Sequence, residues 1–240
     1  MSCEPLLSVR IAFARRAVRD ASAEDDFSLD VAFEARPGVT ILFGPSGSGK
    51  STTLAAIAGL VRPDRGRIAL GDEVWFDSER RIDRPVHERG VAFVFQSLAL
   101  FPHMTAVGNV AYGMDRTLSR DARRARAVEL LARLRVSGLA DRKPSTFSGG
   151  EAQRVALARA FATRPRLALF DEPFSALDRD LRRELVADVR ELIAEQAIPL
   201  VHVTHHRQEA RALGDRVILL EAGRVKETGS VEAYFAEGGA

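Results

Sequence analysis

Apolar and polar residues alternate in two stretches near the N-terminus. Apolar side chains occupy nearly every second position in residues 7–13, and residues 27–33 repeat this period of two. Such alternation predicts two half-buried strands, which we expect to form an antiparallel flap. The polar stretch RRAVRDASAEDD between them predicts a solvated connecting loop.

Short continuous apolar runs predict strands that are covered on both faces. The runs are VTILF from Val39, VAFVF from Val91, LALF from Leu167, PLVHV from Pro199 and RVILL from Arg216. Runs of this length and kind are typical of the buried strands of a parallel sheet. They predict an α/β core.

Between Gln96 and Phe161 the pattern becomes helical. In DARRARAVELLARLRV, the residues Val128, Leu131 and Leu134 form one stripe at helical spacing. The arginines of this segment are explained more simply as a solvated helix face than as a nucleic-acid patch. We therefore expect a helical insertion that interrupts the α/β core.

Composition narrows the class of protein. The 240 residues include 35 Lys and Arg against 33 Asp and Glu, so a net charge of +2 gives no strong field toward nucleic acid. Cys3 is the only cysteine, which excludes an intramolecular disulfide framework. No apolar run has the length of a membrane span, and the N-terminus lacks the apolar core of a secretory signal. A role at a membrane would require a partner.

A glycine-rich loop follows the first buried run and predicts a phosphate site. GPSGSGKST fits GxxxxGK[ST] between a predicted strand and a helix expected from about Ser51 to Ala58. Its glycines allow successive amides to face one concavity, Lys50 supplies positive charge, and Ser51 offers an oxygen to Mg²⁺. The residues expected to bind a nucleoside triphosphate are Gly44, Pro45, Ser46, Gly47, Ser48, Gly49, Lys50, Ser51 and Thr52.

Polar side chains end three other predicted strands. Asp171 and Glu172 follow LALF, where the first carboxylate is suited to Mg²⁺ and the second can act as a general base toward water. Gln96 ends VAFVF, and its amide can coordinate a metal or bind water. His205 follows PLVHVT as a candidate for the terminal phosphate, but the residues alone do not choose among it, His202 and His206.

The segment FSGGEAQR carries a helix start. Ser148 and Glu151 have the spacing of a capping box, in which each side chain accepts a hydrogen bond from the other residue's backbone amide. Gly149 and Gly150 would each cost about 1 kcal/mol relative to alanine in helical geometry. A structural cap alone does not explain them.

Taken in order, these motifs resemble the ATP-binding subunits of ABC transporters. GPSGSGKST resembles the Walker A loop, VFQ the Q-loop, FSGGE the signature, LALFDE the Walker B strand, SALD the D-loop and VTH the H-loop. The resemblance covers nearly the whole chain. It implies an α/β fold with a P-loop NTPase core (a RecA-like parallel sheet), the antiparallel flap and a helical subdomain. The implied boundaries are 1–96 and 161–240 for the core and 97–160 for the subdomain.

The resemblance also implies roles for single residues. Glu172 would be the catalytic carboxylate, His205 the switch histidine and Gln96 the sensor that links nucleotide to permease, while Asp178 would contact a second subunit. ATP is implied with Mg²⁺, which Ser51, Gln96 and Asp171 would hold. Ser148, Gly149, Gly150 and Glu151 would meet the γ-phosphate bound by a partner subunit in a head-to-tail homodimer. Phe13 is the candidate for stacking on adenine.

Within the family, three features are similar to molybdate importer ATPases. They are the segment RPGVTILFGPSGSGKST, the segment GDEVWFDSERRIDRPVHERGVAFVFQ and Glu151 in the signature. Sulfate, polyamine, sugar and iron importers are the alternatives. The chain ends at AYFAEGGA, so we expect no C-terminal regulatory β domain. The implied partners are transmembrane permease subunits and, indirectly, a periplasmic or extracellular substrate-binding protein. The resemblance also implies that this subunit is peripheral on the cytoplasmic face of the cell membrane and that it binds no nucleic acid.

Two other classes share such a nucleotide fold. A DNA-repair or chromosome-organising ATPase requires a long coiled coil between the phosphate loop and the signature, and the interval from Thr52 to Phe147 is too short and irregular for heptads. A translation-associated ATPase would need two such domains. The single loop at Lys50 argues against it.

Overall fold

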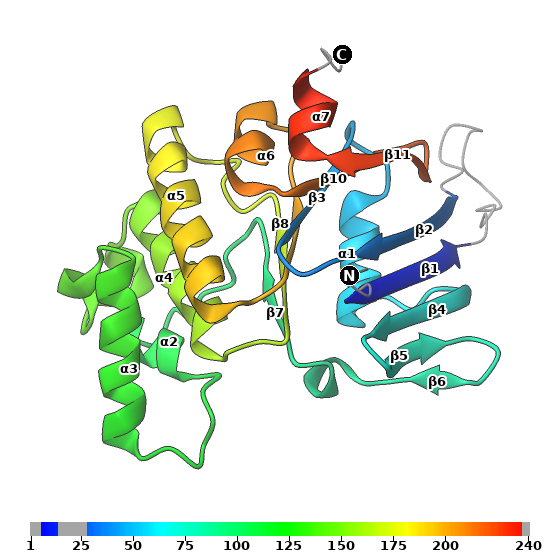
Figure 1. Ribbon diagram of the computed structural model, residues 1–240. Coiled ribbons are helices and arrows are strands. Elements are labelled where there is room, and N and C mark those ends of the chain that lie inside the picture. The colour runs from blue at the N-terminus through cyan, green and yellow to red at the C-terminus, as the bar shows by residue number, and fades with distance from the viewer. Residues whose placement is uncertain (1–5, 14–27, 237–240) are drawn as a thin grey trace, which may run out of the picture. The chain divides into compact units, whose positions relative to one another are not determined.

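The computed structural model describes residues 6–13 and 28–236, which form two compact units (Figure 1). Of the described residues, the first unit contains 6–13, 28–90 and 199–236, and the second contains Val91–Ile198. Both units combine strands with helices. The predicted α/β class is confirmed.

The first unit is built on a mixed sheet. Its strands are β1 (Leu7–Phe13), β2 (Leu29–Ala35), β3 (Val39–Phe43), β4 (Arg65–Leu70), β5 (Glu73–Asp77), β6 (Ile82–Asp83), β9 (Leu200–Val203), β10 (Arg216–Glu221) and β11 (Arg224–Ser230). Their order is β6-β5-β4-β1-β2-β11-β10-β3-β9. Strands β10, β3 and β9 are parallel, whereas β6, β5, β4, β1 and β2 pair antiparallel.

The strand patterns explain which predictions succeeded. The antiparallel flap is confirmed, with Leu7 opposite Ala35, and β2 alternates between buried and exposed positions throughout. Strand β3 is buried along almost its whole length, as its apolar run predicts. The pairing of β4, β5 and β6 was not predicted, because β4 begins with the partly exposed sequence RGR. Phe27 and the polar loop before it lie outside the described residues.

Helix α1 (Lys50–Ala58) begins one residue before its predicted start, and Arg89 fixes its other end. The Arg89 side chain is buried and donates to the carbonyl oxygens of Ala56 (2.9 Å) and Ile57 (2.8 Å). Burial lowers the pKa of this guanidinium, although Asp83 opposes the shift. A buried arginine at a helix C-terminus satisfies carbonyl groups that have no partner within the helix. The remaining helical elements of the unit are α6 (Arg207–Leu213), α7 (Val231–Ala236) and the 3-10 turn η1 (Val86–Glu88).

The second unit packs helices around one parallel strand pair, β7 (Val91–Val94) and β8 (Leu167–Asp171). The helical elements are α2 (Ala106–Ala111), α3 (Arg120–Arg133), α4 (Gly149–Ala162), α5 (Arg179–Gln196), η2 (Ser137–Leu139) and η3 (Pro144–Thr146). Helices α2, α3 and α4 contact one another, and α4 also contacts β7 and α5. The predicted helical segment between Gln96 and Phe161 is therefore confirmed.

The buried face of the α3 segment differs slightly from the predicted stripe. Val128 is only half-buried, whereas Ala127, Leu130, Leu131 and Leu134 are buried. Helix α5 was missed, although its buried residues Leu185, Val189 and Leu192 recur at helical spacing.

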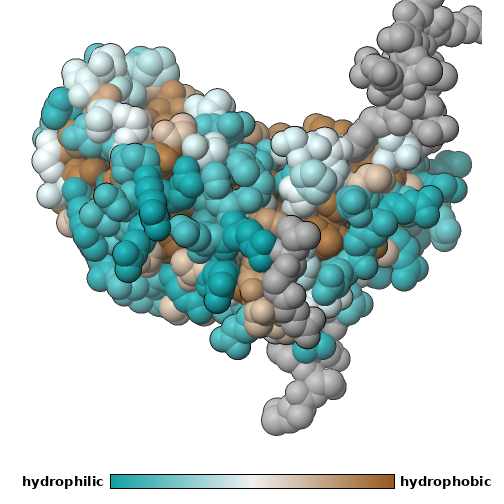
Figure 2. Space-filling model, turned by 90° about the horizontal axis from the view of Figure 1, so that it is seen from above, coloured by the Kyte–Doolittle hydropathy of each residue, from teal (hydrophilic) through white to brown (hydrophobic). Residues whose placement is uncertain are grey.

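Hydrophilic residues, in teal, cover most of the face seen in Figure 2, and hydrophobic atoms emerge in separate areas between them. Among residues 6–13 and 28–236, no helix combines the length and apolar composition needed to cross a bilayer.

Candidate functional site

The loop between β3 and α1 has a backbone that requires glycine. Gly44, Gly47 and Gly49 have φ angles of 149°, 79° and 98°. A Cβ atom at Gly44 would lie 2.0 Å from the Leu220 carbonyl oxygen, a distance that no side chain can accept. With positive φ angles, the chain can turn its amides into one concavity ahead of the helix.

Lys50 brings a positive charge into this loop. Its ammonium donates hydrogen bonds to the carbonyl oxygens of Gly44 (3.0 Å) and Pro45 (2.7 Å), and the residue is 5% exposed. Ser51, on the first turn of α1, is exposed. The lysine charge and the positive end of the helix dipole thus act at the same place. The loop is suited to an anion with several oxygens, such as a triphosphate.

Strand β8 ends in the two predicted carboxylates. Asp171 is its last residue, and Glu172 follows with a φ angle of 46°, in the left-handed region that non-glycine residues rarely adopt. Both residues are half-exposed. Strained backbone of this kind costs about 1–3 kcal/mol and occurs preferentially at functional sites.

Ser175 connects this turn to Gln96. Its hydroxyl donates to the Glu172 carbonyl oxygen (2.9 Å) and accepts from Gln96 Nε2 (3.3 Å). Gln96 and Glu172 are thereby linked through one side chain, although they are far apart in the sequence. The sequence does not predict this link through Ser175, because a hydroxyl's partner depends on how the chain folds.

The SALD segment is held in place by hydrogen bonds with the helix that follows it, α5. Asp178 is the N-cap of α5, and its carboxylate accepts from the amides of Asp180 (3.1 Å) and Leu181 (3.0 Å). Arg182 donates to the carbonyl oxygens of Phe174 (3.2 Å) and Leu177 (2.9 Å). These bonds fix the loop on both sides. Arg182 was not predicted, although an arginine one turn after an N-cap was a usable signal.

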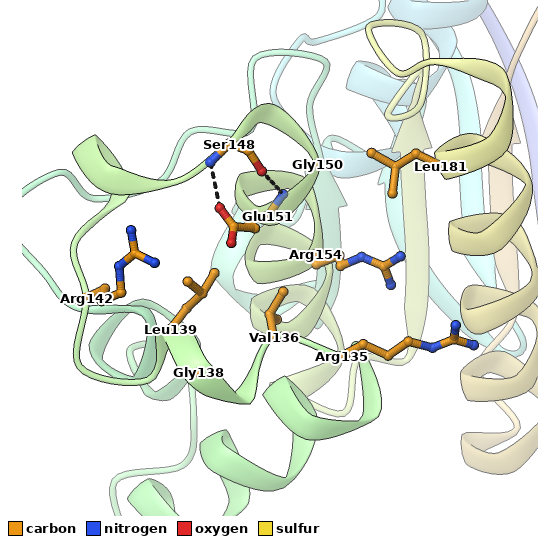
Figure 3. A pocket seen from close by; sticks show the side chains of 10 residues that line it. All are labelled: Arg135, Val136, Gly138, Leu139, Arg142, Ser148, Gly150, Glu151, Arg154 and Leu181. Carbon is orange, nitrogen blue, oxygen red and sulfur yellow. Dashed lines mark hydrogen bonds between the residues drawn. The ribbon is translucent and has the colours of Figure 1, made fainter.

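The capping box at the start of α4 is confirmed. The Ser148 amide donates to Glu151 Oε2 (2.7 Å), and the Glu151 amide donates to Ser148 Oγ (3.3 Å). These bonds to Ser148 hold the pKa of the Glu151 carboxyl below its ordinary value. Figure 3 shows both bonds at the rim of a cavity of about 360 Å³. The cavity is lined by Arg135, Val136, Gly138, Leu139, Arg142, Ser148, Gly150, Glu151, Arg154 and Leu181.

The two glycines of this helix start have different surroundings. A Cβ at Gly149 would meet nothing within 4 Å, whereas a Cβ at Gly150 would lie 2.3 Å from the Leu181 Cδ2 atom. Gly150 therefore packs against Leu181, whose side chain would have to move if a Cβ were added. Gly149 has no such neighbour, so its presence still calls for an explanation outside the chain.

The three histidines near β9 have three different environments. His202 is fully buried, and its Nε2 lies 2.5 Å from Glu209 Oε1. Burial pushes the pKa of Glu209 upward, but the hydrogen bonds from His202 and Thr204 outweigh it, and this pKa lies below its ordinary value. His206 is the N-cap residue of α6 and is half-buried. Only His205 is exposed.

The segment after Gln96 makes a tight turn that Arg159 stabilises. Leu98 and Ala99 have φ angles of 59° and 46°, and the Arg159 guanidinium donates to their carbonyl oxygens (2.9 and 2.7 Å). Beside this turn is an open, mostly apolar hollow of about 380 Å³. It is lined by Val91, Ala92, Phe93, Ala99, Phe101, Tyr112, Gly113, Arg159, Ala160 and Thr163.

Comparison with known proteins identifies the family of this arrangement. The family model described as ABC transporter matches residues 29–175, which is more than half of the chain. The chain belongs to the ABC transporter family.

Among the curated relatives of this ABC protein, the molybdenum import ATP-binding protein ModC of Rhizobium meliloti (strain 1021) is 46% identical over 215 residues, which cover 88% of this chain and 59% of that protein. The sulfate/thiosulfate import ATP-binding protein CysA of Mesorhizobium japonicum (strain LMG 29417 / CECT 9101 / MAFF 303099) is 44% identical over 236 residues, covering 95% of this chain and 65% of that protein. The chain thus spans about three fifths of the length of these relatives.

The fold of this ABC protein also matches solved ATP-binding cassettes. A dimeric structure of the cassette MJ0796 in a post-hydrolysis state, bound to ADP and Pi, has a TM-score of 0.78 and 29% sequence identity. The match covers 94% of this chain and 98% of that one.

Proposed function

We propose that this chain is the ATP-hydrolysing subunit of an ABC importer and powers uptake of molybdate or a related oxyanion through a separate membrane permease. The observation that carries the proposal is the Gly44–Thr52 loop, whose glycine-dependent backbone and buried Lys50 form an anion site at the start of α1. Membership of the ABC family makes ATP the anion. We propose the same domain boundaries as above, with the nucleotide-binding core at 1–96 and 161–240 and the helical subdomain at 97–160.

The loop would bind the phosphates of ATP. Amides of residues 44–52 would face the phosphate oxygens, and the Lys50 ammonium would move from the carbonyls of Gly44 and Pro45 to the outer phosphates. Ser51, Gln96 and Asp171 carry hydroxyl, amide and carboxylate oxygens, the donor types that Mg²⁺ prefers. When bound, Mg²⁺ would neutralise phosphate charge during transfer. Phe13, half-buried at the end of β1, is proposed to stack on adenine.

Glu172 would act as the general base toward the attacking water, and His205 would contact the γ-phosphate. The strained backbone at Glu172, where the Ser175 hydroxyl bonds the carbonyl oxygen, would turn this carboxylate in a direction different from that of Asp171. His205 is preferred over its neighbours because His202 is buried against Glu209 and His206 begins α6. Gln96 would report the state of the nucleotide through its bond to Ser175.

Two copies would close head-to-tail on two ATP molecules. Ser148, Gly149, Gly150 and Glu151 form an exposed to half-exposed helix start, and helix N-termini favour anions. The open space at Gly149 would admit a triphosphate held by the other copy. Asp178 would lie at the same subunit contact. The dimeric state of the cassette MJ0796 supports this assembly.

The permease would dock at the hollow beside the turn after Gln96. Tyr112 is 56% exposed there, and Arg159 anchors the turn to α4. Large exposed aromatic residues are typical of protein contact sites. We propose that the subunit is peripheral on the cytoplasmic face of the cell membrane, and that a periplasmic or extracellular binding protein delivers the substrate to the permease.

The substrate proposal depends on the relatives. Molybdate is favoured because a molybdenum import subunit is 46% identical, and sulfate is the first alternative because the sulfate/thiosulfate subunit is 44% identical. Importers of polyamines, sugars or iron are the next alternatives, and a soluble non-transport ATPase is a remote one. The decisive measurement is ATPase stimulation by the reconstituted permease and binding protein with molybdate or sulfate. A response to neither oxyanion would reject this substrate class.

The catalytic proposal is tested by Glu172→Gln. This variant should bind ATP normally but lose about a hundredfold or more of its steady-state ATPase rate, because a general base contributes that much. Glu191→Gln makes the same chemical change at an exposed position on α5 and should leave the rate unchanged. An unaltered rate in Glu172→Gln would remove this residue from the catalytic role.

A further inference from the structure

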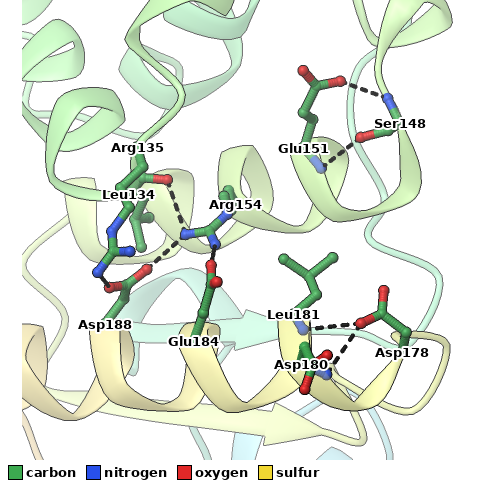
Figure 4. Close-up of polar contacts among 10 residues, drawn as sticks. All are labelled: Leu134, Arg135, Ser148, Glu151, Arg154, Asp178, Asp180, Leu181, Glu184 and Asp188. Atoms are coloured by element: carbon green, nitrogen blue, oxygen red, sulfur yellow. Dashed lines mark hydrogen bonds and ion pairs between the residues drawn. The ribbon is translucent and has the colours of Figure 1, made fainter.

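Arg154 is a buried arginine on the second turn of α4, and it binds two carboxylates on α5. Its side chain is 8% exposed. Nη1 donates to Asp188 Oδ2 at 2.6 Å, and Nη2 donates to Glu184 Oε2 at 3.2 Å (Figure 4). Nη1 also lies 3.2 Å from the Leu134 carbonyl oxygen, just after α3. The guanidinium therefore joins three segments.

Asp188 completes this arrangement. Its side chain is 6% exposed, and its second oxygen accepts from Arg135 Nη2 at 2.9 Å. Both oxygens of the carboxylate thus have charged donors. A buried charge without its partner is strongly unfavourable, so such a pair tolerates few relative positions of the helices that carry it.

A second contact lies one turn closer to the start of each helix. Gly150 faces Leu181 so closely that the Leu181 side chain would have to move to admit a Cβ atom. Gly150 and Arg154 are four residues apart on α4, and Leu181 precedes Glu184 by three residues on α5, so each pair lies on one helix face. The two helices therefore run side by side in the same direction, with Ser148 and Asp178 capping their neighbouring ends (Figure 4).

We propose that Arg154 is a positioning residue that clamps α4 to α5, so that the signature and the D-loop move as one body when the subunits close on ATP. Arg154 acts by fixing the spacing between Ser148, at the start of α4, and Asp178, at the start of α5. The inference rests on the proposed function for the roles of these two ends. With this clamp, the start of α4 and the start of α5 cannot reach the other subunit independently.

A double-mutant cycle between Arg154 and Asp188 tests the clamp. Arg154→Met leaves Asp188 buried with fewer donors, and we expect kcat for ATP hydrolysis to fall about tenfold with little change in KM. Adding Asp188→Met removes that charge and restores apolar packing, and kcat should recover most of the loss. Losses that simply add in the double variant would overturn the proposal.

Arg124→Met is the matched control, because Arg124 pairs with Asp141 at 2.9 Å in the same unit but both side chains are more than half exposed. This variant should keep the wild-type kcat. Should Arg154→Met fail to fold, Leu181→Ala weakens the second contact without exposing a charge and should lower kcat about threefold. A wild-type kcat in Leu181→Ala would count against the clamp.

ATP-dependent dimerisation separates this inference from the function on which it rests. Sedimentation of Glu172→Gln with ATP should show a dimer, and adding Arg154→Met should weaken that dimer about tenfold. Failure of Glu172→Gln itself to dimerise would contradict the proposed assembly. A normal dimer in Glu172→Gln that Arg154→Met leaves unchanged would reject the clamp alone.

Discussion

The phosphate loop at Gly44–Thr52 and the signature at Phe147–Arg154 both place glycines at the start of a helix, but for different reasons. In the loop, Gly44 and Gly47 have positive φ angles, and at Gly44 the nearest obstacle is a backbone oxygen. In the signature, Gly149 and Gly150 lie within helix α4, and neither has a positive φ angle. The loop glycines are required by the fold itself.

Under the proposed function, this difference separates residues that build a site from residues that leave room for a ligand. A Cβ at Gly44 would require the backbone to move, whereas a Cβ at Gly149 would enter open space. Stability measurements should therefore detect substitutions in the loop. Activity measurements should detect substitutions in the signature.

The largest effect is expected for Gly44→Ala. The strained φ angle and the clash with the Leu220 carbonyl should lower the free energy of unfolding by about 3 kcal/mol, measured by urea denaturation. Gly47→Ala is the control, because its Cβ would meet no atom within 4 Å. Its loss should be about 1 kcal/mol, from the φ angle alone. Equal losses in both variants would show that the contact with Leu220 is unimportant.

Gly149→Ala should show the opposite combination. Alanine in a helix is favourable by up to about 1 kcal/mol, so the free energy of unfolding should stay the same or rise. The ATPase rate should nevertheless fall by about a hundredfold, the effect of disturbing one donor to a reacting phosphate. Gly138→Ala, also in open space in the same unit, should leave the rate unchanged. A fully active Gly149→Ala would remove the distinction between the two regions.

Ser148→Ala should affect both measurements. Loss of the N-cap should cost about 1 kcal/mol in thermal or urea unfolding. Because the hydroxyl is also proposed to contact the γ-phosphate, the ATPase rate should fall by about a hundredfold. Ser119→Ala removes the corresponding cap of α3, where Ser119 accepts from the Ala122 amide at 3.1 Å. It should cost similar stability with a normal rate, and equal rates in the two variants would leave Ser148 with a capping role only.

The smallest effect is the pH dependence of the capping box. Because bonds to Ser148 lower the pKa of Glu151 from 4.5, the folded state favours the charged carboxylate. Its contribution to stability is complete above the unfolded value and is lost as the pH falls through the lowered folded value. Hydrogen exchange of the first-turn amides of α4 should accelerate in that acidic range relative to the trend in Glu151→Gln, which retains an acceptor. Identical pH profiles would contradict this origin of the shift.

The sequence alone determined the features that depend on neighbouring residues. The capping box joins positions three residues apart, and the Gly44–Thr52 loop lies between a strand and a helix that its own flanking patterns predict. Alternation and apolar runs likewise gave β1, β2, β3, β7, β8, β9 and β10 at or within two residues of their observed bounds. Such local signals depend on backbone geometry and side-chain period.

Only the tertiary structure decided the features whose partners are distant in the sequence. It distinguished buried His202 from exposed His205, placed Leu181 against Gly150, and brought Arg154 to Asp188. None of these follows from spacing, because burial and ion pairing depend on which segments the fold packs together. The sequence predicts where phosphates should bind, whereas packing determines which side chains join α4 to α5.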